Sequence, residues 1–223
     1  MSDKPSVAVV LAGCGNRDGS EIHEATLTLL AIHRHGADYH CYAPDRNQTH
    51  VISHLTGQEM AERRHVLTEA ARIARGRIRP LTAFDAGAHD ALIFPGGFGA
   101  AMNLCDYAEK GKAGQPLPEV AQAIAAMRAA NKPIGALCIA PVVLAPAIPG
   151  VTLTIGNDEK VAADLEAMGA RHQKSGPDGV VVDRNLRVVT TPCYMFDDIR
   201  LDTLADSIDR LVAAVLELAA THN

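Results

Sequence analysis

Short apolar runs alternate along the chain with longer segments in which apolar residues recur at helical spacing. Continuous apolar runs of this length are typical of strands that are buried on both faces of a sheet. They predict strands at Ser6–Ala12, Asp38–Ala43, Ala91–Phe94, Pro133–Cys138, Val151–Ile155, Val180–Val182 and Arg187–Thr191. The helical spacing predicts helices at Ser20–His35, Arg64–Arg75, Glu119–Ala130, Asp158–Met168 and Leu201–Ala220, and the polar stretch Glu109–Pro118 predicts a loop.

The alternation of strands with helices predicts an α/β fold with a mostly parallel sheet and helices on both faces. The chain has 223 residues, a usual size for one domain, so we expect a single domain over residues 1–223. Ligands of such sheets bind beyond the carboxyl ends of the strands. This rule singles out the three loops that follow Ala12, Phe94 and Leu137.

Cys138 stands where a predicted strand passes into a predicted helix, with small residues two positions before and after it. A nucleophile elbow requires small neighbours because its turn is tight. The helix that opens at Ala140-Pro141 would place its partial positive charge near the sulfur and favour the thiolate. The alternative is a buried cysteine that acts as a small apolar residue. Cys14 competes for the role of nucleophile, because its loop lies at the same end of the sheet.

The Pro95-Gly96-Gly97-Phe98-Gly99 loop follows another buried strand. Glycines let backbone N–H groups approach a ligand closely, so the N–H of Gly97 and the N–H of Ile139 are candidate donors to an oxyanion. The alternative is a plain tight turn.

Glu24 lies one turn into the first predicted helix, on a face that it shares with Leu27 and Ala31. A carboxyl group buried on that face would have a raised pKa and could exchange protons with a nearby sulfur. The alternative is a solvated helix residue. Asp18 and Glu21 have the spacing of a capping box, which predicts a structural role for Glu21.

Composition narrows the functional classes. Apolar residues make up 48% and charged residues 21%, and the net charge of −5 does not favour nucleic acid or an anionic membrane as partner. Five cysteines without a CxxC pair argue against a zinc knuckle or a dithiol redox motif and suggest a reducing, cytoplasmic location. The sequence has no phosphate-binding loop, no complete dinucleotide fingerprint and no convincing metal-ligand spacing, so no motif points to a bound nucleotide or a metal ion.

Several motifs together resemble the ThiJ/PfpI superfamily, and within it the ElbB-type glyoxalases, the enhancing lycopene biosynthesis protein family. The similarity covers nearly the whole chain. The motifs are Gly13-Cys14-Gly15, the segment Asp18–Glu24, Ala43-Pro44-Asp45, the segments His54–Gly57, Glu69–Ile73 and Pro95–Ala101, Asn103-Leu104, the segment Cys138–Pro141, and Thr190-Thr191-Pro192.

The resemblance implies a flavodoxin-like three-layer sandwich, shared with class I glutamine amidotransferases. It also implies that Cys138 is the nucleophile, that Glu24 is the acid beside it, and that Gly97 and Ile139 supply backbone donors. A homodimer without a cofactor is expected, acting on a small aldehyde by converting glyoxal to glycolate. Deglycase activity, which has been claimed across the superfamily, stays open beside glyoxalase activity.

The chain departs from amidotransferases and PfpI-type peptidases in its histidines. Those proteins carry a histidine directly after the nucleophile or on a later strand, whereas this chain has Ile139 and, on the later strand, Gly156. His23 is the histidine nearest to the expected site, where it caps the helix or faces solvent. The departure argues against glutaminase and peptidase activity, because acyl transfer requires a base beside the nucleophile. Two alternatives stay open: a cysteine-based oxidative-stress sensor or chaperone-like protein, and an amidotransferase-like domain that acts with a partner enzyme.

Overall fold

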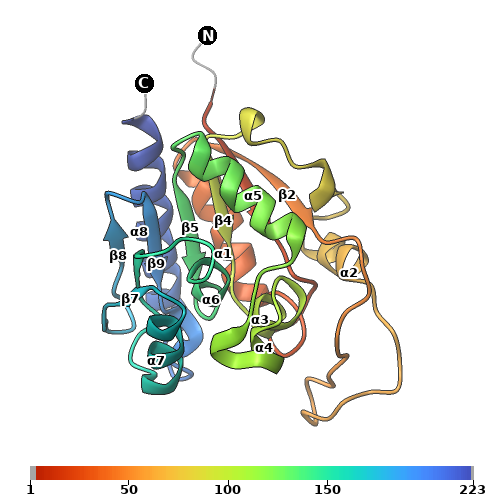
Figure 1. Cartoon of the computed structure of the whole chain (residues 1–223). Coiled ribbons are helices and arrows are strands. Elements are labelled where there is room, and N and C mark those ends of the chain that lie inside the picture. The colour runs from red at the N-terminus through yellow and green to blue at the C-terminus, as the bar shows by residue number, and fades with distance from the viewer. Residues whose placement is uncertain (1–3, 222–223) are drawn as a thin grey trace.

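The computed structural model describes residues 4–221 and contains a seven-stranded sheet in the order β3-β2-β1-β4-β5-β9-β8 (Figure 1). Its strands are β1 (Ser6–Val10), β2 (Asp38–Ala43), β3 (Ile78–Pro80), β4 (Ala91–Phe94), β5 (Ile134–Leu137), β8 (Val181–Asp183) and β9 (Val188–Thr191). All neighbouring strands run parallel except β8, which is antiparallel to β9. The predicted α/β fold with a mostly parallel sheet is therefore confirmed.

Helices cover both faces of this sheet, which makes the fold a flavodoxin-like three-layer sandwich. In Figure 1, α5 crosses in front of the central strands, while α1 and α8 lie behind them and pack against each other. The helices are α1 (Ile22–Arg34), α2 (Val66–Ile73), α3 (Phe98–Asn103), α4 (Tyr107–Lys110), α5 (Pro118–Ala129), α6 (Pro141–Leu144), α7 (Glu159–Ala167) and α8 (Leu201–Ala220).

The central strands are buried on both faces, as their continuous apolar runs predict. Every residue of β4 and β5 is buried. Gly135 in β5 lets α8 approach closely, because a Cβ atom at this position would lie 3.1 Å from Val215 Cγ2 and 3.2 Å from Leu211 Cδ2. The core is therefore closely packed beneath the strand that leads into Cys138.

The strand order reverses between β1 and β4, since β2 lies on one side of this pair and β5 on the other. Ligands of open parallel sheets bind at such a reversal, beyond the carboxyl ends of the strands. The loops that leave β1, β4 and β5 meet there. The topology thus brings together the three loops that the sequence singles out.

Two local predictions are wrong, and two short strands were not predicted. The stretch Glu109–Pro118 is not a continuous loop: it holds the end of α4, a 3-10 turn at Gly111–Ala113 and the first residue of α5. A salt bridge of 2.6 Å between Lys110 and Asp106 supports the short helix α4, which is too brief to show an apolar period. The run Val151–Ile155 forms only a two-residue strand, β6 (Thr152–Leu153), which pairs with β7 (Arg171–His172) outside the main sheet. Strands β3 and β7 were not predicted, because they are short and carry arginine.

Candidate active site

Cys138 follows β5 directly and has the left-handed backbone of a nucleophile elbow. Its φ is 57°, a value that non-glycine residues rarely adopt and that marks a locally strained turn. The turn is held by hydrogen bonds from Cys138 N to Thr191 O (2.9 Å) and from Ala140 N to Leu137 O (2.9 Å). The predicted tight turn from strand to helix is therefore present, with Cys138 at its strained position. The side chain of Cys138 is largely buried, but it lines a cavity at this end of the sheet.

The glycine loop after β4 packs directly against this elbow. A Cβ atom on Gly96 would lie 2.4 Å from both Cys138 Cβ and Glu24 Oε2, so only glycine fits there. Gly97 has a φ of 95°, and a Cβ atom on it would lie 2.3 Å from Glu21 N. The loop is thus more than a plain turn, because its missing side chains allow three segments of the chain to meet.

The two expected backbone donors both reach the sulfur. The N–H groups of Gly97 and Ile139 donate hydrogen bonds to Cys138, and these bonds act to lower the pKa of its thiol. Donors placed at the sulfur are also close to the atom that would become an oxyanion when the sulfur attacks a carbonyl carbon.

Glu24 is completely buried beside Cys138, so the alternative of a solvated helix residue is wrong. Its Oε2 atom accepts a hydrogen bond from Gly96 N (3.1 Å), its Oε1 atom accepts one from Tyr194 N (3.2 Å), and its carboxyl group hydrogen-bonds to Cys138. Burial raises the pKa of Glu24 to about 8, and the charge of Glu21 adds to the rise. The group therefore gains and loses its proton close to neutral pH.

The helix that carries Glu24 is capped differently from the prediction. Glu21 is itself the N-cap of α1, where its Oε2 atom accepts a hydrogen bond from Glu24 N (2.7 Å). Asp18 does not take part in a capping box, because its Oδ2 atom accepts from Ile52 N (2.7 Å) in a neighbouring loop. The cap places Glu24 in the first turn of α1, which faces the glycine loop.

The expected thiolate of Cys138 is not favoured in the unliganded site. Burial raises the pKa of its thiol well above the ordinary value, and the charge of Glu24 raises it further. Helix α6 spans only four residues, so its dipole is too small to offset these effects. Because two buried anions in contact repel each other, the Cys138–Glu24 pair holds at most one negative charge near neutral pH.

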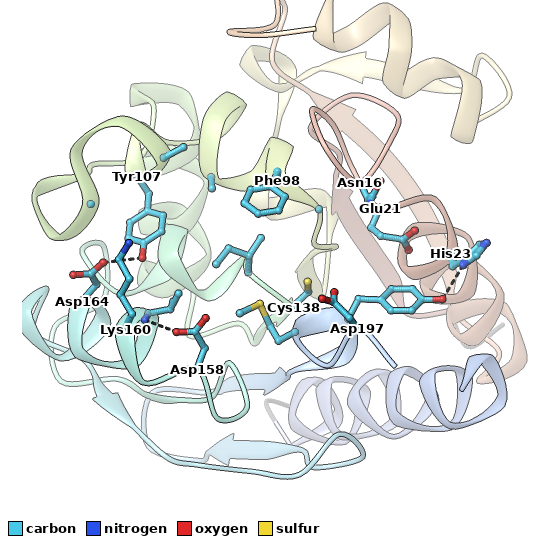
Figure 2. Close-up of a pocket in the computed structure, with 18 residues that line it drawn as sticks. Asn16, Glu21, His23, Phe98, Tyr107, Cys138, Asp158, Lys160, Asp164 and Asp197 are labelled. Atoms are coloured by element: carbon cyan, nitrogen blue, oxygen red, sulfur yellow. Dashed lines mark hydrogen bonds between the residues drawn. The ribbon is translucent and has the colours of Figure 1, made fainter. Parts of the chain in front are cut away.

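A cavity of about 970 Å³ opens above this pair. Cys138 and Ile139 lie at its floor, and the start of α3, the helices α4 and α7, and the turn after β9 form its walls. Figure 2 shows Tyr107, Lys160 and Asp164 on one side of the cavity and Glu21 and His23 on the other. The nucleophile candidate is therefore accessible to a ligand even though most of its surface is covered.

Tyr194 is a residue of the site that the sequence reasoning missed. Its N–H donates to Glu24, and its side chain lines the cavity and hydrogen-bonds through its hydroxyl to His23 Nδ1 (2.9 Å). His23 is thus exposed and bound to Tyr194 rather than to Cys138. The only sequence signal was position, since Tyr194 follows the Thr190-Thr191-Pro192 motif at the end of a strand beside β5.

The structure also shows what surrounds Cys14 and Gly156, the two remaining positions that the sequence singles out. Cys14 is half-buried and does not line the cavity, which leaves Cys138 as the cysteine with access to it. Gly156 has a φ of 87°, and a Cβ atom there would lie 2.6 Å from Phe196 Cε2. The ring of Phe196 therefore occupies the space that a histidine at this position would need.

No set of three or more His, Cys, Asp or Glu side chains within residues 4–221 is arranged to hold a metal ion. In the same part of the chain, none of the helices has the length and apolar character needed to cross a membrane.

Comparison with known proteins finds relatives over nearly the whole chain. No family model matches. The rat "ES1 protein homolog, mitochondrial" is 45% identical over 222 residues, which is 95% of this chain and 83% of the relative. The human "Glutamine amidotransferase-like class 1 domain-containing protein 3, mitochondrial" is 44% identical over 222 residues, which is 95% of this chain and 82% of the relative.

Because both relatives are named as mitochondrial, they contradict the predicted cytoplasmic location. Unpaired cysteines indicate only a reducing environment and do not identify the compartment.

Solved structures support the same relationship. An isoprenoid biosynthesis protein with an amidotransferase-like domain from Ehrlichia chaffeensis has a TM-score of 0.88 and 33% identity, over 95% of this chain and 99% of that one. Glyoxalase III from Candida albicans, with a TM-score of 0.59 and 13% identity, covers 94% of this chain and 97% of its own, and shares the fold.

Proposed function

This chain belongs to the family of the ES1 proteins and the glutamine amidotransferase-like class 1 domain-containing proteins, and on that premise we propose that it is a cofactor-independent glyoxalase of the ElbB type. The observation that carries the proposal is the pairing of a completely buried carboxyl group with a cysteine on a strained elbow at the floor of a cavity. A carboxyl group whose pKa is about 8 suits proton transfer at neutral pH.

The first step joins the sulfur to glyoxal. The pair shares one proton, and Cys138 attacks an aldehyde carbon as the thiolate while Glu24 carries that proton. The carbonyl oxygen becomes an oxyanion that accepts hydrogen bonds from Gly97 N and Ile139 N. Glu24 then protonates the oxyanion, which leaves a neutral hemithioacetal on Cys138 and a carboxylate on Glu24.

The second step moves hydrogen between the two carbons. The Glu24 carboxylate removes the proton from the carbon that bears the sulfur, and the electron pair forms an enediolate with the neighbouring aldehyde. The hydroxyl proton shifts between the two oxygens, and Glu24 returns its proton to the second carbon. The product is a glycolyl thioester on Cys138, which water hydrolyses to glycolate and the free thiol. The sum is one glyoxal and one water giving one glycolic acid.

An amidotransferase role has less support from the same cavity. His23 is the histidine in its lining, and its Nδ1 atom bonds to the Tyr194 hydroxyl rather than facing the sulfur. Glyoxal is an activated aldehyde and reacts without such a base, whereas glutamine hydrolysis requires one. The homodimer that the resemblance implies stays a prediction.

The test is conversion of glyoxal by the purified protein with no added thiol or cofactor, followed by NMR. We expect one glycolate per glyoxal consumed, and no turnover above background for Cys138→Ala. Undiminished turnover by Cys138→Ala, or a product other than glycolate, would contradict the proposal. A circular-dichroism melt of the variant shows that it is folded.

A further inference from the structure

The cavity above Cys138 is far larger than the substrate considered so far. Its volume is about 970 Å³, whereas glyoxal has only four non-hydrogen atoms. Cavities of ~300–1,000 Å³ commonly hold drug-sized ligands. Extending the proposed function and resting on it, we propose that the natural substrate is a substituted glyoxal, a 2-oxoaldehyde on a longer chain that ends in a positively charged ammonium group.

The part of the cavity around the sulfur suits the carbon chain of such a molecule. Ile139 lies directly after Cys138, and the side chains of Phe98, Val161 and Met195 also line the cavity. Phe98 is 59% exposed at the start of α3, although a ring of this size normally lies in the core. A ligand chain lying on this ring would cover apolar surface that otherwise faces water, which is favourable.

The charge of the lining selects the sign of the far end. Four carboxylates, those of Glu21, Asp158, Asp164 and Asp197, face one ammonium group, that of Lys160, which gives the lining a formal charge of −3 while His23 is neutral. A concave surface with one predominant sign of charge concentrates ligands of the opposite sign. An aldehyde with a terminal carboxylate or phosphate would be repelled.

These carboxylates have capacity left for a ligand. Asp158 uses Oδ1 to cap α7 at Val161 N (2.9 Å), and Asp164 uses Oδ2 to accept from the Tyr107 hydroxyl (2.8 Å). Neither uses its second oxygen in a hydrogen bond with the described residues. Asp197 is exposed and forms no ion pair within residues 4–221. Asp158 and Asp164 lie on the wall that α7 forms, away from Glu21 and His23 (Figure 2).

The test compares three substituted glyoxals of equal length whose far ends are a methyl, a trimethylammonium or a carboxylate group. The quaternary ammonium is used because a primary amine would condense with its own aldehyde. We expect kcat/KM to be highest for the cation and lowest for the anion. The charged pair should differ by about tenfold or more at low ionic strength, and the difference should shrink as salt is added.

Two neighbouring aspartates provide a matched pair of variants. Asp197→Asn should lower the ratio of kcat/KM for the cationic substrate to that for the neutral one, because Asp197 lines the cavity. Asp198→Asn should leave this ratio unchanged, because the next residue is exposed but lies outside the lining. Lys160→Gln should raise the ratio.

Two negative results have different meanings. Turnover of all three compounds with equal kcat/KM, or with the carboxylate preferred, would overturn this inference and leave the glyoxalase proposal standing. No turnover of these compounds or of glyoxal would contradict the proposed function, and the inference would fall with it.

Discussion

Cys138 and Cys193 both lie just beyond the ends of two neighbouring parallel strands, Cys138 directly after β5 and Cys193 two residues after the end of β9. Both have left-handed backbones, with φ values of 57° and 47°, and both are buried close to Glu24. Only Cys138 lines the cavity and receives the N–H groups of Gly97 and Ile139. Cys193 is inaccessible, and its sulfur is hydrogen-bonded to the hydroxyls of Ser207 and Thr191. The two cysteines therefore share a strained turn and differ in access to the cavity and in backbone donors at the sulfur.

The largest expected effect separates the two sulfurs. Cys138→Ser should lower glyoxal turnover by roughly 10³-fold or more, because a serine hydroxyl is a much weaker nucleophile than a thiol. Cys193→Ser should keep most of the turnover and lose about 1–3 kcal/mol of stability, since it alters a buried polar contact. Steady-state kinetics and urea unfolding measure both. Equal loss of turnover in the two variants would show that the comparison is wrong.

Glu24 provides the next largest effect. Glu24→Gln should lower kcat by ~10²–10⁴, the usual contribution of a group that transfers protons. The same change should speed alkylation of Cys138 by iodoacetamide, because it removes the carboxylate charge that raises the pKa of the thiol. Faster alkylation together with slower turnover would distinguish loss of chemistry from misfolding. Unchanged turnover would remove Glu24 from the mechanism.

A smaller effect on turnover is expected from a side chain added at Gly96, where the glycine loop contacts Cys138 and Glu24. Gly96→Ala would place a methyl group 2.4 Å from Cys138 Cβ and from Glu24 Oε2, so the pair must separate. A displacement of this order can cost ~10²-fold in rate. Gly176→Ala is the control, because its Cβ atom would make only one ordinary contact, 3.5 Å from Asp178 Oδ1. The account fails here if the two variants turn over glyoxal equally well.

The mildest test varies pH alone. The pKa of Glu24 is about 8, raised above its usual value by burial and by Glu21. Below that pH the Cys138–Glu24 pair holds both protons, and above it one proton leaves and the reactive singly charged pair forms. The rate should therefore rise with pH, with a midpoint near 8, in a profile of kcat/KM for glyoxal. A rate that is constant from pH 6 to pH 9, a range chosen around that value, would argue against the shared proton.

Much of the fold could be predicted from the sequence because its signals are local. The apolar run of β4 and the helical spacing of α8 gave the observed bounds, and the bounds predicted for β2 also match. Strands β3 and β7 have three and two residues, too few for a period to appear. The direction of β8 depends on its partner strand and not on its own residues.

The site was predictable at positions where a characteristic side chain, or the absence of a side chain in glycine, carries the signal. Cys138, Glu24 and Gly97 carry such signals, and the structure brings them together. Tyr194 acts on Glu24 through its backbone N–H, which every residue except proline possesses, so its residue type gave no signal and only its position after a motif did. The raised pKa of Cys138 could not be predicted from the sequence either, because it depends on burial by segments that are distant in the chain.

The central claim is that the sulfur of Cys138 bonds to the substrate carbon while Glu24 moves the proton beside it. The most direct measurement is mass spectrometry of the protein quenched with acid during glyoxal turnover. We predict a mass increase of one glyoxal, confined to the Cys138 peptide, which hydroxylamine removes as glycolohydroxamate because the adduct is a thioester. Rapid turnover with Cys138 unmodified, or with the adduct on another residue, would contradict the account.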